Sequence, residues 1–366
     1  MNLLLFNIRT DLADPTFGFT TTWINALAQR CKRVVVVTMQ TGLVEVESNV
    51  EVHALSSVTG TSRPRKVARF YRAVLRALSS QPIDACFAHM TPHLASLFWP
   101  VARLYRIPVV LWYAHGSVPL SLRIAHPLVD RCLTSTRDGF RLKSNKLSVV
   151  GQGIDTKLFF PPTSHSPGYD RTAVSVGRIT PRKRLEEIIE AIGLSRRAGV
   201  DVRLLIVGGP VTDSDRLYEA ELKALARSLD IDDAVAFRGA VPFPRVPETY
   251  RRAGLFVNVS ETESLDKAIL ESMASGSIPV SRNRSFAAIA RDEDLDFLVP
   301  PQGAKGVADC LRDLLARPKV EHDVLRQRLR AIVREDHSLD SLMDEVRKHL
   351  EQLAFGQSLR DTSKPE

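Results

Sequence analysis

The sequence predicts an α/β protein with two Rossmann-like, doubly wound domains that face each other across a cleft. First, its 366 residues exceed what a single hydrophobic core usually supports. Second, short apolar segments with the pattern of strands alternate with helical segments through the first half of the chain. Third, the same alternation begins again after a segment rich in Pro, Gly and Ser. Such alternation is typical of parallel sheets covered by helices on both faces.

The first domain is predicted to span residues 1–165. Its clearest strands are the apolar runs 2–6, 33–39 and 109–115, and residues 20–30 have the pattern of a helix. The run at 33–39, RVVVVTM, is continuously apolar, as expected for a strand that is buried on both faces of its sheet.

The second domain is predicted to span residues 166–340, and the segment at 146–170, which is dense in Pro, Gly and Ser, suits a linker before its first strand. Residues 173–179 and 255–260 have the pattern of strands in this domain. Residues 341–366 are expected to form a closing helix that packs back toward the first domain, followed by a frayed tail.

The net charge of +8 comes from the first half of the chain, where residues 1–165 hold nineteen Lys and Arg against nine Asp and Glu. Arg65, Arg69, Arg72 and Arg76 recur at helical spacing and form one basic helix face. This face is either an ordinary solvated surface or a site that attracts anionic lipid headgroups. No helix-turn-helix or aromatic-interleaved pattern accompanies the charge, so a nucleic-acid partner is not expected.

The sequence favours a cytoplasmic protein. Its four cysteines lack CxxC spacing, which argues against structural zinc. The first apolar run is too short for a signal peptide, and the longest apolar region contains Arg103 and Arg106, which a membrane-spanning helix would not carry. We therefore expect at most peripheral attachment at the inner face of a membrane.

Arg178 and Lys183 follow a predicted strand and precede a predicted helix. Two cations at the carboxyl end of a strand, beside a helix N-terminus, suit a diphosphate. The alternative is a pair of surface cations in a basic loop.

Glu263 and Glu271 form a second pair, separated by seven residues in SETESLDKAILESMASG. Glu263 comes before the predicted helix and Glu271 lies on one of its early turns, so both carboxylates can reach one cleft. Carboxylate oxygens accept hydrogen bonds well from the paired hydroxyls of a sugar. Alternatively, both are acids that interact with the helix dipole.

These motifs together resemble glycosyltransferase family 4, whose members have the GT-B fold and retain anomeric configuration. The resemblance includes the spaced glutamates, the GR-x4-K pattern of Arg178 and Lys183, the linker VGQGIDTKLF and the later FRG, ETYRRAGLFVNVS and DLDFLVPP segments. It covers residues 1 to about 353 and is strongest over the second domain.

The resemblance implies that the second domain binds a nucleoside-diphosphate sugar and the first domain binds the acceptor. Arg178 and Lys183 would hold the diphosphate, Glu271 the ribose and Glu263 the transferred sugar. With His115, the residues Arg178, Lys183 and Glu263 form the expected catalytic set.

In the first domain, Gly18 corresponds to the family's glycine-rich turn near the diphosphate, and His115 to a histidine near the transferred sugar. A strand-end histidine that is satisfied by the backbone is the alternative for His115. No metal and no other cofactor is expected, and the acceptor is expected to be a sugar or a lipid-linked molecule.

The sequence departs from the family where Glu-Gly-Phe-Gly is usual and residues 263–266 read Glu-Ser-Leu-Asp. The expected donor-binding segment continues through Leu265, Asp266, Lys267 and Ala268. Asp266 takes the place of a glycine, where it could contact sugar hydroxyls or pair with Lys267. We therefore expect an altered sugar preference.

Two other motifs are not interpreted as metal sites. Asp213 and Asp215 resemble a DxD motif but lie before a helix, where acids cap. His89 and His93 are separated by Pro92, which argues against one shared helix face.

The predicted function is transfer of a sugar from a nucleoside diphosphate to an acceptor hydroxyl, in cell-surface polysaccharide or glycolipid biosynthesis. A nucleotide-sugar epimerase of the same fold and a phosphorylase-like enzyme are alternatives. A non-catalytic nucleotide-sugar-binding protein is a third, suggested by the altered loop at Leu265 and Asp266.

Overall fold

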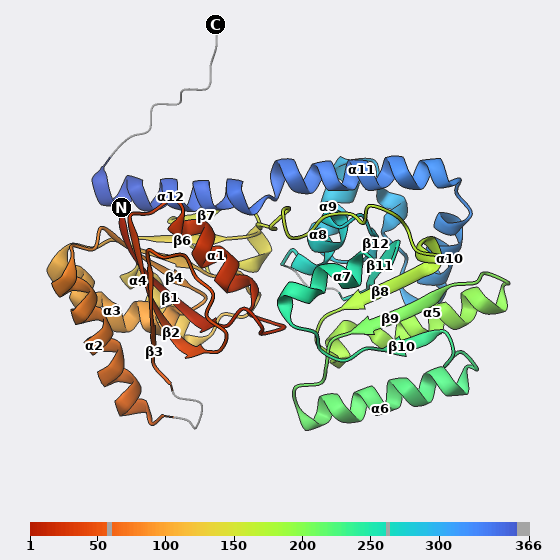
Figure 1. Ribbon diagram of the computed structural model, residues 1–366, viewed down its shortest axis with the longest axis horizontal. Coiled ribbons are helices and arrows are strands. Elements are labelled where there is room, and N and C mark those ends of the chain that lie inside the picture. The colour runs from red at the N-terminus through yellow and green to blue at the C-terminus, as the bar shows by residue number, and fades with distance from the viewer. Residues whose placement is uncertain (57–60, 261–263, 357–366) are drawn as a thin grey trace, which may run out of the picture. The chain divides into compact units, whose positions relative to one another are not determined.

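The structure, a computed structural model, describes residues 1–56, 61–260 and 264–356. The chain forms two compact units (Figure 1). The first unit comprises residues 1–153 and the segment that begins at Leu339, and the second comprises Ile154–Ser338. The division therefore falls earlier than residue 165, because the Pro-rich part of the linker packs within the second unit.

The first unit contains a parallel sheet with the strand order β3-β2-β1-β4-β5-β6-β7. Its register is set by pairs such as Leu3 with Val34 and Leu3 with Ala85. The strands are β1 (Asn2–Thr10), β2 (Arg33–Thr41), β3 (Val50–Ala54), β4 (Ala85–His89), β5 (Val109–Trp112), β6 (Arg131–Thr134) and β7 (Leu147–Val149).

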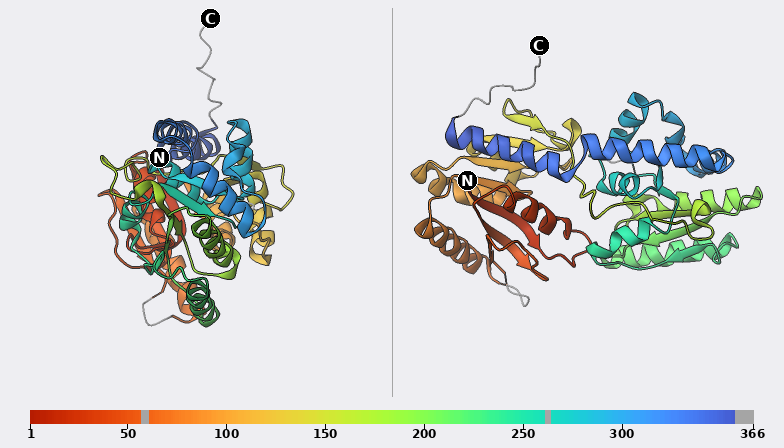
Figure 2. Two further views of the ribbon diagram at one scale, coloured as in Figure 1. Left: turned by 90° about the vertical axis from the view of Figure 1, so that its right-hand side faces the viewer. Right: turned by 45° about the horizontal axis from the view of Figure 1, so that its top comes forward.

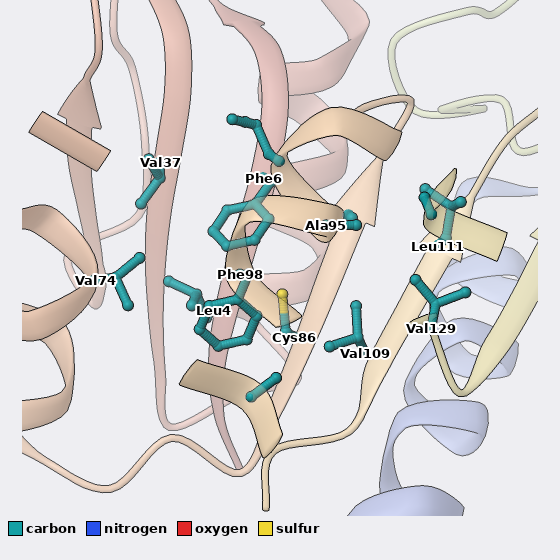
Figure 3. Packing of buried hydrophobic residues seen from close by; sticks show 14 of the residues in the cluster. Leu4, Phe6, Val37, Val74, Cys86, Ala95, Phe98, Val109, Leu111 and Val129 are labelled. Carbon is teal, nitrogen blue, oxygen red and sulfur yellow. The ribbon is translucent and has the colours of Figure 1, made fainter. Parts of the chain in front are cut away.

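Helices cover both faces of this sheet. The helices α2 (Arg63–Ser80), α3 (Pro92–Tyr105) and α4 (Leu120–Leu128) pack against one face around Phe6, Phe70 and Phe98, as Figure 3 shows in part. The helices α1 (Phe19–Ala28) and α12 (Leu339–Phe355) pack against the other face. The predicted doubly wound arrangement is confirmed in this unit.

The second unit contains a smaller parallel sheet with the order β10-β9-β8-β11-β12. Its strands are β8 (Thr172–Val176), β9 (Arg203–Val207), β10 (Val235–Phe237), β11 (Leu255–Asn258) and β12 (Ile278–Ser281). Its helices are α5 (Leu185–Arg197), α6 (Asp213–Ser228), α7 (Val246–Tyr250), α8 (Lys267–Ala274), α9 (Arg284–Asp292), α10 (Gly303–Leu315) and α11 (Lys319–Asp336).

The strand order places β8 and β11 side by side at the point where the chain changes its direction of travel across the sheet. From β8 the chain moves outward through β9 and β10, and it then returns to the other side of β8 to form β11 and β12. In such sheets a ligand usually binds beyond the carboxyl ends of the strands, at the point where the strand order reverses in this way.

The C-terminal helix α12 belongs to the first unit. Its side chains Leu342, Met343, Val346 and Leu350 are buried against that unit's sheet and α1. The right-hand view of Figure 2 shows α12 running alongside the strands of the first unit. At the beginning of the helix, Arg30 contacts Asp340 and Asp344 and attaches α1 to α12.

No helix in the part of the chain that the structure describes is both long and apolar enough to cross a membrane.

The packing of α12 predicts that Met343→Ala destabilises the first unit by about 2–5 kcal/mol, because it leaves a cavity at a fully buried position. All three tryptophans, Trp23, Trp99 and Trp112, lie in this unit, so tryptophan fluorescence during urea unfolding reports on it. Lys348→Ala on the exposed face of the same helix should cost less than about 0.5 kcal/mol. Equal midpoints for Met343→Ala and the wild type would show that α12 is not part of this core.

Candidate functional site

Two glycines form the base of the candidate site in the second unit. Gly177 follows β8 with φ of 139°, and Gly208 follows β9 with φ of 143°, values that side chains rarely allow. A Cβ on Gly208 would lie 1.8 Å from the carbonyl oxygen of Gly177, so the two turns can touch only without a side chain. The contact between these two turns was not predicted from the sequence, although a glycine directly after each of the two strands could have indicated it.

Lys183 extends over this base. It closes a short 3₁₀ helix, Pro181–Lys183, and its backbone N–H donates to the Thr180 carbonyl at 2.9 Å. A Cβ on Gly177 would lie 3.3 Å from Cε and 3.6 Å from Nζ of Lys183. The ammonium is therefore held beside the carboxyl end of β8, as predicted for a residue that follows this strand.

The Lys183 ammonium donates to Oδ2 of Asp266 at 2.7 Å. The same carboxylate oxygen accepts from Nδ2 of Asn258 at 2.9 Å, and Oδ1 caps α8 by accepting from the Ala268 N–H at 3.2 Å. Burial would raise the pKa of Asp266, but the charge of Lys183 and these hydrogen bonds lower it below its ordinary value. Asp266 is therefore an ionised carboxylate, paired with Lys183 at the switch point between β8 and β11.

Two asparagines that were not predicted as site residues contact Ser260 and Ser264, which lie between β11 and α8. Besides Asp266, Asn258 binds the Ser260 N–H, which donates to Oδ1 at 3.0 Å. Asn283, which caps α9, donates from Nδ2 to the Ser264 carbonyl at 3.0 Å. Each asparagine ends or follows a strand, so their positions at strand ends were the signal available in the sequence.

Glu271 lies on the second turn of α8 and is 8% exposed. Its Oε2 accepts from the hydroxyl of Tyr250 at 3.1 Å, and Tyr250 is fully buried. Burial raises the pKa of Glu271 and lowers that of Lys267, and the attraction between the two opposes both shifts. Glu271 is thus a fixed acceptor near Lys267 and not a freely solvated helix acid.

Arg178 extends toward α6. Its guanidinium lies 3.7 Å from Oδ2 of Asp215, and its side chain is 50% exposed. Asp215 forms a capping box with Thr212 at the start of α6, which agrees with its interpretation as a cap. Among the described residues, no cluster of three or more His, Cys, Asp or Glu is placed to hold a metal.

The remaining predicted donor-site residues differ in exposure. Leu265 is 4% exposed and Ala268 is 8% exposed, so both side chains pack inside the unit, and only their backbones can face a ligand. Glu263 lies outside the residues that the structure describes.

A buried ion pair connects two of the segments around the candidate site. Arg282, directly after β12, donates to both carboxylate oxygens of Glu187 on α5, at 2.5 and 2.8 Å. The same guanidinium reaches the carbonyls of Val259 and Pro301, each at 3.3 Å. It therefore connects the start of α5 to the loop that follows β11.

Gly18 and His115 belong to the first unit. Gly18 precedes α1 with φ of −55°, a conformation open to any residue, and its N–H donates to the Asp14 carbonyl at 2.9 Å. His115 follows β5 and is exposed; its Nδ1 accepts from the Ser117 N–H at 3.0 Å. Because Nδ1 accepts, the neutral ring carries its proton on Nε2, the nitrogen that Ser117 does not contact.

The structure therefore brings Lys183 and Asp266 into direct contact, with Lys267 and Glu271 close enough to influence each other's charge. It directs Arg178 toward Asp215. The second unit thus presents an ammonium, paired with the Asp266 carboxylate, above a base of two glycines, and an ammonium at the carboxyl end of a strand suits an anionic ligand.

Comparisons with known structures define the class of the fold. Anabaena Alr3699/HepE, solved in complex with UDP and glucose, aligns with a TM-score of 0.73 at 14% identity over 95% of this chain and 99% of that chain. WaaG, a glycosyltransferase involved in lipopolysaccharide biosynthesis, aligns with a TM-score of 0.66 at 14% identity, with 95% and 99% coverage. The chain has the GT-B fold, as predicted.

Sequence comparisons show which known families and proteins the chain resembles. Residues 170–317 match the family described as "Glycosyl transferases group 1". A D-inositol 3-phosphate glycosyltransferase of Kribbella flavida is 25% identical over 372 residues, with 88% of this chain and 86% of that protein aligned. The matched segment lies within the second unit and includes Lys183, Asp266 and Glu271.

The contact between the two glycine turns predicts that Gly208→Ala destabilises the second unit by more than about 3 kcal/mol, since a methyl group would overlap the Gly177 carbonyl. Gly199→Ala is the matched control: Gly199 has φ of 82°, but nothing lies within 4 Å of the position that its added methyl group would take. It should cost about 1 kcal/mol. Far-UV circular dichroism during urea unfolding measures both variants, and equal losses would contradict the close approach of the turns.

Proposed function

We propose that the protein is a retaining glycosyltransferase that moves a sugar from a nucleoside-diphosphate sugar to an acceptor hydroxyl. The observation that carries this proposal is the position of the Lys183 ammonium, at the switch point between β8 and β11 and inside the segment that matches the group 1 family. An ammonium at that point suits the charge that develops on a departing diphosphate. Alr3699/HepE, which shares the fold, was solved with UDP and glucose, and this supports a nucleotide-sugar donor.

Lys183 and Arg178 would bind the diphosphate. Lys183 already faces the switch point, whereas Arg178 must turn away from Asp215 to reach the same ligand. The side chain of Arg178 is half exposed and the 3.7 Å contact with Asp215 is long, so this movement costs little. The N–H groups of Ala268 and Ile269 at the start of α8 already donate to Asp266, so the two cations would supply the charge stabilisation, and no metal is needed for it.

Glu271 would accept hydrogen bonds from the ribose hydroxyls. Tyr250 donates to Oε2 of its carboxylate, and Oε1 is the oxygen proposed to accept from the ribose. Glu263 is proposed to contact the transferred sugar, together with the backbone of Leu265 and Ala268. In the first unit, Gly18 is proposed to lie near the diphosphate.

His115 is proposed to bind a hydroxyl of the transferred sugar. The Ser117 N–H occupies Nδ1, so Nε2 remains as the donor that a ligand oxygen can accept from. The leaving diphosphate oxygen would take the proton of the acceptor hydroxyl, with attack on the same face of the sugar. Bond formation to the acceptor and cleavage of the bond to the diphosphate then give the glycoside and a nucleoside diphosphate.

The acceptor is proposed to be a sugar or lipid-linked molecule of cell-surface polysaccharide or glycolipid biosynthesis. WaaG acts in lipopolysaccharide biosynthesis and shares the fold, which supports this class of acceptor. The protein would work in the cytoplasm, attached peripherally to the inner face of the membrane.

The outer face of α2 supports this attachment. Arg65, Arg69, Arg72 and Arg76 are all exposed on it, while Phe70 and other side chains of the helix enter the core. Arg69 also donates to the Leu55 carbonyl at 3.3 Å, so its role is partly structural. Each exposed arginine near an anionic bilayer contributes about 1 kcal/mol.

A non-catalytic nucleotide-sugar-binding protein is the second candidate function. The pairing of Lys183 with Asp266 favours it, because the ammonium that would stabilise the leaving group already forms an ion pair with a carboxylate of the protein. Detectable sugar transfer to any acceptor would exclude this candidate.

The proposed role of Lys183 predicts that Lys183→Ala lowers the transfer rate by about a hundredfold to a thousandfold, because the leaving diphosphate loses its main cation. The measurement is product formation with the best donor from a panel of nucleotide sugars. Arg182→Ala, in the same 3₁₀ helix but exposed, is the control and should keep near-normal activity. Normal transfer by a folded Lys183→Ala protein would remove Lys183 from the mechanism.

The basic face of α2 predicts binding to anionic vesicles that weakens with salt. The double variant Arg72→Ala with Arg76→Ala should bind about thirtyfold more weakly in co-sedimentation with phosphatidylserine vesicles, as expected for the loss of two charges. Arg197→Ala with Arg227→Ala removes two exposed arginines from the second unit and serves as the control. If both double variants bind equally well, α2 is not the membrane contact.

A further inference from the structure

Asp266 occupies the place where an anionic ligand of the second unit would bind. Its carboxylate receives hydrogen bonds from three groups: the Lys183 ammonium at 2.7 Å, the Asn258 amide at 2.9 Å and the Ala268 N–H at 3.2 Å. An ammonium and an amide at a helix N-terminus are groups that commonly bind phosphate oxygens. The carboxylate, which is part of the protein, therefore accepts the hydrogen bonds that these groups could otherwise donate to a phosphate.

We propose that Asp266 is an internal counter-anion of the donor site, which neutralises Lys183 in the free protein and is exchanged for the diphosphate when a donor binds. This inference rests on the proposed function, since it assigns a specificity-determining residue to the same site. It explains why a site that binds anions contains an acid at its centre.

The exposure of the two partners makes the exchange feasible. The side chains of Lys183 and Asp266 remain 22% and 20% exposed, so water can reach both. In the ion pair of Arg282 and Glu187, by contrast, the side chains are only 6% and 7% exposed, and the geometry is bidentate. Separating that pair would leave two buried charges, whereas separating Lys183 from Asp266 leaves groups that solvent and ligand can satisfy.

After the exchange, Oδ2 of Asp266 keeps its hydrogen bond from the Asn258 amide at 2.9 Å. Asp266 also keeps its role as the cap of α8 through Oδ1, which Lys183 does not use. The carboxylate can therefore release Lys183 without losing all of its partners.

The exchange has a consequence for specificity. Any anion that binds Lys183 must first compete with a carboxylate at 2.7 Å that is attached to the protein. A diphosphate carries more charge and more acceptor oxygens than a carboxylate, so it can win this competition, whereas weaker anions are rejected. Asp266 thus lowers the affinity for the donor and, in return, excludes singly charged anions from the site.

The test is the affinity for UDP, GDP and ADP, measured by isothermal titration calorimetry in metal-free buffer. Asp266→Asn removes the charge and keeps an oxygen to cap α8, and it should bind the preferred nucleotide at least about tenfold more tightly, equivalent to about 1.4 kcal/mol. Asp213→Asn is the matched control, because Asp213 is a fully exposed acid on the same unit with the same charge. It should change the affinity less than about twofold.

A double-mutant cycle shows whether the effect acts through Lys183. In a Lys183→Ala background, Asp266→Asn should give no gain in affinity, because the cation that Asp266 neutralises is absent. An equal gain with and without Lys183 would overturn the proposed exchange and leave only a general charge effect.

The remaining outcomes separate the inference from the function on which it rests. If the wild type binds a nucleotide and Asp266→Asn binds it equally or more weakly, the counter-anion role is wrong and the proposed function stands. If neither protein binds any of the three nucleotides, the proposed function fails and the inference fails with it. Asp266→Ser, which also suits a helix N-cap, replaces Asp266→Asn if the asparagine variant does not fold.

Discussion

The contact between Lys183 and Asp266 depends on the order of strands in the second unit. The chain forms β9 and β10 before it places β11 next to β8. Residues that are 83 positions apart therefore meet at the carboxyl ends of these two strands. The glycine turns after β8 and β9 then keep the space beneath Lys183 free of side chains. A sheet order, two backbone conformations and one ion pair together define the candidate site.

The charges of this unit fall into two groups with different roles. Arg282 and Glu187 form a buried, bidentate pair that connects the segments directly after β11 and β12 to the start of α5. Lys183 and Asp266 form a partly exposed pair in the loops above, where both partners can exchange ligands. A binding site needs both kinds of pair. The buried pair keeps the backbone in place, so that a ligand moves only the side chains of the exposed pair.

Much of the fold could be predicted from the sequence. Apolar runs such as 33–39 form buried strands, and their alternation with helices gives two doubly wound units, since strand-helix periodicity is a local property of the chain. The boundary at Gly153 was harder to predict, because Pro and Gly mark a linker but do not show on which side its residues pack. Placing Lys183 directly after a strand and Glu271 on a helix required only the order of motifs.

The partners of the site residues could not be predicted. Asp266 was expected to contact sugar hydroxyls or Lys267, and the structure pairs it with Lys183, because side-chain direction depends on the register of β8 against β11. Arg178 extends toward Asp215, a contact between loops after different strands that no local pattern shows. Asn258 and Asn283 were missed for the same reason: single asparagines carry no periodic signal.

A crystal structure of the protein with its preferred nucleoside diphosphate tests the central claim most directly. The expected result is a phosphate oxygen within hydrogen-bonding distance of the Lys183 ammonium, with Asp266 no longer in contact with Lys183. A diphosphate bound elsewhere, with the contact between Lys183 and Asp266 intact at 2.7 Å, would contradict both the location of the site and the role of its central ion pair.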